Sequence, residues 1–248
     1  MKVVVVGASS GLGRRIGIAL AERGASVALL ARRLTRLADA AAQAGPNSVA
    51  IECDVTDPAS VCRAIDEAAT TLDGIDALLY APGIGPLDRI EDIDIDTWRR
   101  TFDTNVIGAS LVTAAALPHL ARSAGVAAYL STVSASQTPP WPGLAAYVVT
   151  KAALDKLVEA WRIEHPTVGF TRVVVGDCEA PEHAGRSEFN ADWDMELFRD
   201  LYPLWQQRGL TGNGLIEIDE LVAVVERVLQ CGASASIPTV ALTPRPRA

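Results

Sequence analysis

A tyrosine and a lysine four residues apart, Tyr147 and Lys151, have the types and spacing in this 248-residue chain that best suit acid–base chemistry. The composition of residues 147–154 predicts a helix, and side chains at positions i and i+4 share one face of a helix. An ammonium near a phenol favours the phenolate, so Lys151 should lower the pKa of Tyr147. Such a tyrosine could exchange a proton with a substrate near neutral pH. The alternative is an accidental pair on a solvated face, so the proposal needs support from the rest of the chain.

A glycine-rich segment between the first predicted strand and the first predicted helix indicates a nucleotide site. Glycines let a backbone turn tightly and approach a pyrophosphate, and the first turn of a helix offers free N–H groups. The spacing is GxxxGxG, which differs from the GxGxxG of many dehydrogenases. A tight connection without any ligand is the alternative. The residues that would line the site are Gly7, Ser9, Ser10, Gly11, Leu12 and Gly13.

Two arginines, Arg32 and Arg33, follow the second predicted strand, where an adenosine ribose would lie. A guanidinium suits a 2′-phosphate through its charge and paired donors, so the chain should prefer NADP(H) over NAD(H). Arg32 is the better candidate for this contact, and two solvated arginines at a strand end are the alternative. Asp54, after the third predicted strand, either accepts a hydrogen bond from the adenine amino group or is an ordinary turn residue.

The elements that must position these groups alternate between short apolar runs and amphipathic helices. This pattern predicts right-handed βαβ crossovers and a doubly wound parallel α/β sheet, the Rossmann fold, in a single domain over residues 1–248. A long helix should cover about 96–122, and Pro118 could interrupt it. Strands are expected near residues 3–6, 26–31, 49–53, 75–80, 126–131, 168–175 and 237–242.

Residues 177–215 break this alternation and follow a predicted strand. Because ligands bind beyond the carboxyl ends of parallel strands, we interpret the segment as a substrate lid rather than a disordered tail. Its aromatic content favours a bulky apolar or aromatic substrate. His183 is expected to be a solvated loop residue rather than a second acid–base group. The aromatic residues are Phe189, Trp193, Phe198, Tyr202 and Trp205.

Charge and composition exclude several classes of partner. A net charge of −8 and a pI near 4.9 argue against nucleic acid and against an anionic membrane surface. No apolar run approaches the roughly 18 residues of a membrane span, and the four scattered cysteines favour a reduced protein without a metal site. We therefore expect a soluble cytoplasmic protein.

Taken together, these motifs resemble the short-chain dehydrogenase/reductase family along nearly the whole chain. Ser134 lies thirteen residues before Tyr147, the separation that the family favours. Two stretches depart from the family pattern. Tyr80-Ala81-Pro82-Gly83 keeps small residues at Ala81 and Gly83 but lacks the usual asparagines, and Gly176-Asp177-Cys178 replaces the usual Pro-Gly beside the nicotinamide. The matching motifs are Gly7-x-x-x-Gly11-x-Gly13, Asp54-Val55, Asn105-Val106-Ile107-Gly108, Ser134 and Tyr147-x-x-x-Lys151.

The resemblance implies hydride transfer between a nicotinamide coenzyme and a small-molecule carbonyl or alcohol, with Tyr147 as the proton donor. Lys151 would also bind the nicotinamide ribose, Ser134 would donate to the carbonyl oxygen, and Asn105 would hold a water that links Lys151 to solvent. A homodimer or homotetramer is implied, with the helices near Asp96 and Tyr147 as contact surfaces. A non-catalytic NADP(H)-binding regulator of the same fold, or an epimerase or dehydratase of the family, remains open.

Overall fold

The strands of this protein form one parallel sheet in the order β3-β2-β1-β4-β5-β6-β7, as seen in a computed structural model that describes residues 1–179, 189–211, 214–232 and 234–245. The chain order reverses between β1 and β4, and ligands of such sheets bind at the carboxyl ends beside this switch point. The prediction of a doubly wound parallel sheet is confirmed. The strands are β1 (Lys2–Val6), β2 (Ser26–Ala31), β3 (Ser48–Glu52), β4 (Ala77–Tyr80), β5 (Val126–Thr132), β6 (Gly169–Val175) and β7 (Thr239–Leu242).

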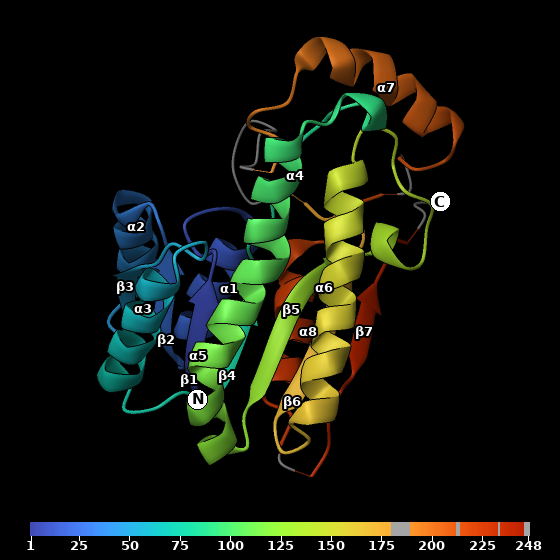
Figure 1. Ribbon diagram of the computed structural model, residues 1–248. Coiled ribbons are helices and arrows are strands. Elements are labelled where there is room, and N and C mark those ends of the chain that lie inside the picture. Colours follow the sequence, from blue (N-terminus) through green and yellow to red (C-terminus); the bar gives the residue numbers. More distant parts are fainter. Residues whose placement is uncertain (180–188, 212–213, 233, 246–248) are drawn as a thin grey trace.

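Helices cover both faces of the sheet, and the alternation of strand side chains explains the two layers (Figure 1). In β1, Val3 and Val5 pack into one apolar cluster while Val4 and Val6 pack into the other. On the first face lie α1 (Gly11–Glu22), α2 (Leu34–Ala44) and α8 (Ile218–Leu229); on the second lie α3 (Pro58–Thr71), α5 (Gly108–Ser123) and α6 (Ala145–Glu164).

The long helix begins and ends where we expected, but its irregularity lies elsewhere. It runs without a break from Ile95 to Ser123 and passes through Pro118. A π-helical turn, Asp103–Ile107, separates α4 (Ile95–Phe102) from α5 instead. The buried hydroxyl of Tyr80 donates to the Thr104 carbonyl inside this turn. The prediction of an interruption at Pro118 was therefore wrong. The irregularity of the helix lies instead at the π turn, where Tyr80 of β4 contacts it.

By length and composition alone, the helix Ile95–Ser123 could cross a membrane. Its core residues Val112, Ala116 and Leu120 are fully buried against the sheet. A core helix of a globular domain meets the same criteria, so the finding does not indicate a membrane span.

The aromatic segment after β6 folds over the carboxyl edge of the sheet. Asp194 caps the amino end of α7 (Met195–Gln207) by accepting from the backbone of Glu196. Leu201 and Trp205 of α7 are buried against Leu87 and Val148, which forms a third apolar cluster. Part of the expected lid, residues 180–188 with His183 and residues 212–213, lies outside the described residues.

Candidate active site

The glycine-rich turn connects β1 to α1 and is shaped by close backbone approach. Gly7 has a φ of +80°, and a Cβ on it would lie 2.9 Å from the Pro82 nitrogen. A Cβ on Gly13 would lie 2.5 Å from the Gly7 carbonyl oxygen and 2.9 Å from the Ala81 Cβ. Side chains are therefore excluded at both positions, and the first turn of α1 faces a cavity with its N–H groups available to an anion.

The two arginines after β2 point to different parts of this cavity. Arg33 donates to the Ser9 and Ser10 hydroxyls at 2.9 and 3.0 Å, which brings it against the glycine-rich turn. Arg32 lies near Asp54. Burial would raise the pKa of Asp54, but hydrogen bonds from Thr56 and the charge of Arg32 outweigh it and lower that pKa. The structure thus places Arg33 against the glycine-rich turn and Arg32 near Asp54.

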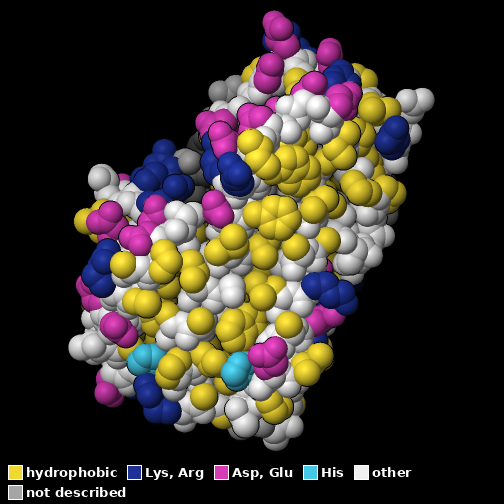
Figure 2. Space-filling model, in the orientation of Figure 1, with side chains coloured by type: hydrophobic (Ala, Val, Ile, Leu, Met, Phe, Trp, Pro, Cys, Tyr) yellow, Lys and Arg dark blue, Asp and Glu magenta, His cyan; other side chains and the backbone are white. Residues whose placement is uncertain are grey.

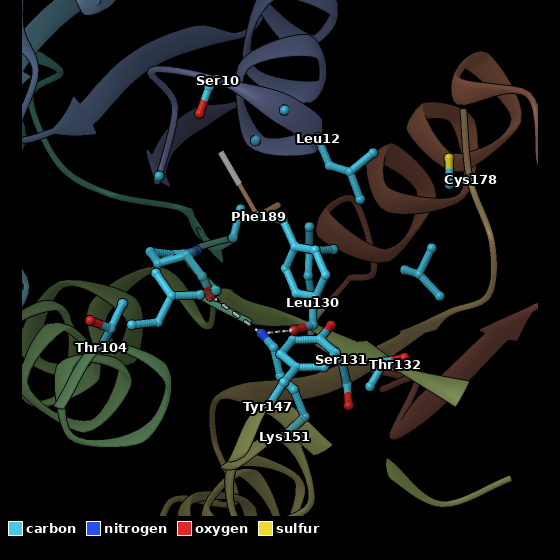
Figure 3. Close-up of a pocket in the computed structure, with 18 of the residues that line it drawn as sticks. Ser10, Leu12, Thr104, Leu130, Ser131, Thr132, Tyr147, Lys151, Cys178 and Phe189 are labelled. Carbon is cyan, nitrogen blue, oxygen red and sulfur yellow. Dashed lines mark hydrogen bonds between the residues drawn. The ribbon is translucent and has the colours of Figure 1, made fainter. Parts of the chain in front are cut away.

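The tyrosine and the lysine share one face of α6, as their spacing predicted. The Lys151 Nζ lies 5.9 Å from the centre of the Tyr147 ring and donates to the backbone carbonyls of Leu130 at 2.9 Å and Pro82 at 3.2 Å (Figure 3). Gly83 packs against the same amine, because a Cβ there would be 3.2 Å from Nζ. Two uncharged backbone carbonyls thus fix the position of the Lys151 ammonium near the Tyr147 ring.

Burial dominates the ionisation of both groups. It raises the pKa of Tyr147 to about 12, and a hydrogen bond with the Thr132 side chain opposes this only in part. It lowers the pKa of Lys151 to about 8, opposed by the charge of Asp155. The expected lowering of the Tyr147 pKa is therefore wrong for this structure, because loss of solvation outweighs the influence of an amine that is not directed at the hydroxyl.

Ser134 lies on a 3₁₀ turn, Val133–Ala135, directly after β5. Its hydroxyl lies 3.0 Å from the Thr132 hydroxyl, and Thr132 lines the cavity together with Ser134 and Tyr147. The end of β5 therefore brings Ser134 and Tyr147 to the same wall of the cavity. Thr132 is a further polar group of this wall that the sequence motifs did not indicate.

Asn105 is fully buried in the π turn and does not line the cavity. Its amide exchanges two hydrogen bonds with the backbone of Ile84, at 2.9 and 3.0 Å, and donates a third to the Thr150 hydroxyl at 2.9 Å. Asn105 thus joins the loop after β4 to α6, one residue before Lys151. The water-holding role expected for Asn105 stays a prediction.

These elements enclose one continuous cavity of about 660 Å³ at the carboxyl edge of the sheet. It extends from the arginines and the glycine-rich turn to the Tyr147 ring, a volume within the range of about 300–1,000 Å³ typical of small-molecule sites. Apart from Asn105, all expected site residues line it: Gly7, Ser9, Ser10, Gly11, Leu12, Gly13, Arg32, Arg33, Asp54, Val55, Ala81, Gly83, Ser134, Tyr147, Lys151 and Gly176.

The end of the cavity at Tyr147 is aromatic. The Phe189 ring meets the Tyr147 ring edge to face with centres 4.8 Å apart, and it projects toward Tyr147 in Figure 3. Trp193 packs on Phe189 at 5.7 Å and donates from its indole nitrogen to the Gly85 carbonyl at 2.7 Å. Trp141 completes this wall. Within the described residues, no cluster of His, Cys, Asp or Glu could hold a metal ion.

Two residues of the site carry no sequence signal that we recognised. Thr150 is the side-chain partner of Asn105, and the i+3 spacing from Tyr147 in a helix is the pattern that could have revealed it. Asp155 continues the i+4 spacing from Lys151 and is buried, which is unusual for a carboxylate.

Comparison with known proteins places these features in context. A family model described as short chain dehydrogenase matches residues 1–182. The Arabidopsis thaliana protein 11-beta-hydroxysteroid dehydrogenase 1A is 36% identical over 205 residues, which are 80% of this chain and 58% of that relative. The chain therefore spans little more than half of that relative's length.

Solved structures resemble the whole fold. A short-chain type dehydrogenase/reductase from Mycobacterium marinum superimposes with a TM-score of 0.81 at 25% identity, covering 98% of this chain and 93% of that one. An alcohol dehydrogenase from the archaeon Thermococcus sibiricus, complexed with 5-hydroxy-NADP, superimposes with a TM-score of 0.79 at 23% identity, covering 97% and 94%. The latter likeness concerns the fold alone.

Proposed function

This chain belongs to the short-chain dehydrogenase family, and from that premise we propose that it is an NADP(H)-dependent oxidoreductase that interconverts a carbonyl and an alcohol. The observation that carries the proposal is the single cavity joining the glycine-rich turn to the Tyr147 ring. Members of this family are NAD(P)-dependent dehydrogenases and reductases. The coenzyme preference, the proton donor and the substrate class are the proposed part.

The residues of the cavity fit a dinucleotide. The spaces at Gly7 and Gly13 admit no side chain, and the start of α1 offers N–H groups to a pyrophosphate. Arg33, with the Ser9 and Ser10 hydroxyls 2.9 and 3.0 Å away, provides a cation and two hydroxyls for a 2′-phosphate. Arg32 adds a second positive charge on the same side. These contacts support NADP(H) over NAD(H).

When bound, the coenzyme supplies the hydride, and the protein positions the substrate and handles the proton. A pKa of about 12 keeps Tyr147 protonated at neutral pH, so it suits the role of acid toward a carbonyl oxygen in the reductive direction. Ser134 donates to the same oxygen and stabilises the charge that develops there. The Lys151 ammonium stabilises the phenolate that remains once Tyr147 has released its proton.

The aromatic wall supports a bulky apolar or aromatic substrate. Trp141, Phe189 and Trp193 line the cavity around the Tyr147 ring, while Leu144 and Leu215 add apolar surface. An aromatic group on the substrate could pack edge to face against these rings, as Phe189 does against Tyr147.

Replacement of Tyr147 by Phe tests the proposed proton donor. Because general acid catalysis contributes about 10²–10⁴-fold, Tyr147→Phe should lose more than about a hundredfold in turnover of NADPH with a panel of ketones. NADPH binding, followed by thermal shift, should be unchanged. Tyr129→Phe is the matched control, because it removes the hydroxyl of a buried tyrosine that does not line the cavity. Turnover by Tyr147→Phe at the wild-type rate would exclude this donor, and NADPH binding without turnover of any carbonyl or alcohol would favour a regulator.

Self-association through α4, α5 and α6 is the proposed quaternary arrangement. These helices lie side by side, and apolar side chains spread over the face that they form (Figures 1 and 2). Ile107 and Val149 are 48% and 45% exposed on this face. Val149→Glu should therefore shift a dimer or tetramer toward monomer in light scattering. An unchanged mass would place the contact elsewhere.

A further inference from the structure

The face of α6 that carries Tyr147 and Lys151 continues to a third ionisable group at the same spacing, Asp155. Successive steps of four residues place the three side chains one above the other along the helix. Asp155 is 5% exposed and lies on α6, one helical turn beyond Lys151. The mechanism proposed above makes no use of it.

Among the residues that the structure describes, neither oxygen of the Asp155 carboxylate has a hydrogen-bond partner. Asp155 forms an ion pair with Arg172 of β6, whose Nη1 lies 3.8 Å from the Asp155 Oδ2. The same Nη1 lies closer, at 3.0 Å, to the Glu159 carboxylate. The neighbouring Ser131 hydroxyl is also buried without a partner. A buried carboxylate in such a position destabilises the folded state, and unsatisfied buried polar groups in native proteins require an explanation.

The surroundings of Lys151 supply that explanation. The residue is 3% exposed, and the two hydrogen-bond partners of its amine, the carbonyls of Leu130 on β5 and Pro82 after β4, carry no net charge. Burial lowers the pKa of Lys151 to about 8, and Asp155 is the charged group that opposes this effect. Conversely, burial raises the pKa of Asp155, while Ser131 and the charges of Arg172 and Lys151 lower it and Glu159 raises it.

We propose that Asp155 is a positioning residue that keeps the Lys151 amine in its ammonium form from a buried position that does not line the cavity. The proposal rests on the proposed function, in which Lys151 must be charged when Tyr147 releases its proton. Two backbone carbonyls fix where the amine lies, and Asp155 supplies the negative charge that those carbonyls lack. The energetic cost of burying a carboxylate without hydrogen bonds is thereby linked to the charge state of Lys151.

The test uses the small number of lysines. The chain has only Lys2, Lys151 and Lys156, so protein labelled with ¹³C-lysine gives three side-chain signals, and Lys151→Met assigns one of them. In the wild type the Lys151 signal should titrate near pH 8. In Asp155→Asn the midpoint should fall by about one unit, a tenfold change in the ratio of ammonium to amine.

Glu159→Gln is the matched control, because it removes another carboxylate of α6 that pairs with Arg172 but lies eight residues beyond Lys151. It should leave the Lys151 midpoint nearly unchanged. Asp155→Ser serves as the second neutral variant should Asp155→Asn not yield folded protein. An equal Lys151 midpoint in the wild type and in a folded Asp155 variant overturns the proposal.

Activity provides the second readout. A group with a pKa near 8 loses its positive charge as the pH rises through that value, so the alkaline limb of carbonyl reduction should move to lower pH in Asp155→Asn. Turnover at pH 6 should remain close to that of the wild type. A purely structural role would instead lower turnover equally at every pH and contradict the proposal. If the wild type reduces no carbonyl, the proposed function fails while the lysine titration still decides the role of Asp155.

Discussion

Tyr80→Phe should uncouple the π turn from the sheet. Tyr80 is fully buried, and its hydroxyl donates to the Thr104 carbonyl, adjacent to Asn105. Phenylalanine keeps the ring but leaves that part-buried carbonyl without this donor, and the loss costs about 1–3 kcal/mol. For a protein of this size, the melting temperature should fall by about 2–12 °C. Because Asn105 clamps the loop at Ile84 to α6, turnover should also fall, by about tenfold.

Tyr129→Phe is the matched control for this substitution. Tyr129 is equally buried, 6.4 Å from Tyr80 between ring centres, and its hydroxyl pairs with the Thr113 hydroxyl at 2.7 Å. Thr113 keeps its bond to the Ala109 carbonyl at 2.6 Å, so this loss should cost only about 0.5–1.5 kcal/mol. Calorimetry and steady-state NADPH turnover should be measured for both variants. Equal melting temperatures and equal turnover in the two would refute the reasoning, because the contact in the π turn would then have no special role.

The remaining predictions concern the two ends of the cavity. Arg33→Ala should raise the KM for NADPH by about tenfold or more and should raise the KM for NADH far less. Arg32→Ala should act in the same direction. An unchanged ratio of the two KM values would contradict a contact with the 2′-phosphate. Gly13→Ala should lower both the melting temperature and NADPH binding in thermal shift, because its Cβ would lie 2.5 Å from the Gly7 carbonyl oxygen; wild-type values would show that the turn can adjust. Phe189→Ala should expose the Tyr147 ring to water and lower the pKa of Tyr147 from about 12 toward its ordinary value. The absorbance of the Tyr147 phenolate should then develop at lower pH. An unchanged titration would mean that other groups bury the phenol.

Local patterns were sufficient for the fold and for most of the cavity lining. The unbroken apolar run at residues 3–6 predicted a strand buried on both faces, and β1 has that environment. The position of Gly7 and Gly13 after this strand placed the turn at the carboxyl edge of the sheet. The four-residue step from Tyr147 to Lys151 brought both onto one face of α6. Each of these inferences depends on backbone geometry that neighbouring residues determine among themselves.

Tertiary packing decided the chemical environment of those groups. Whether Lys151 influences the phenol depends on which carbonyls hold its amine, and these come from Pro82 and Leu130, distant in sequence. The contact of Arg33 with the Ser9 hydroxyl depends likewise on where the glycine-rich turn lies after folding.

The chain by itself thus determined which chemical groups are present and which element carries each of them, because helix and strand periodicity are local. The folded structure alone decided their protonation and their partners. Loss of water around Tyr147, Lys151 and Asp155, and the approach of β4 to the long helix at Thr104, arise only when segments distant in sequence pack together.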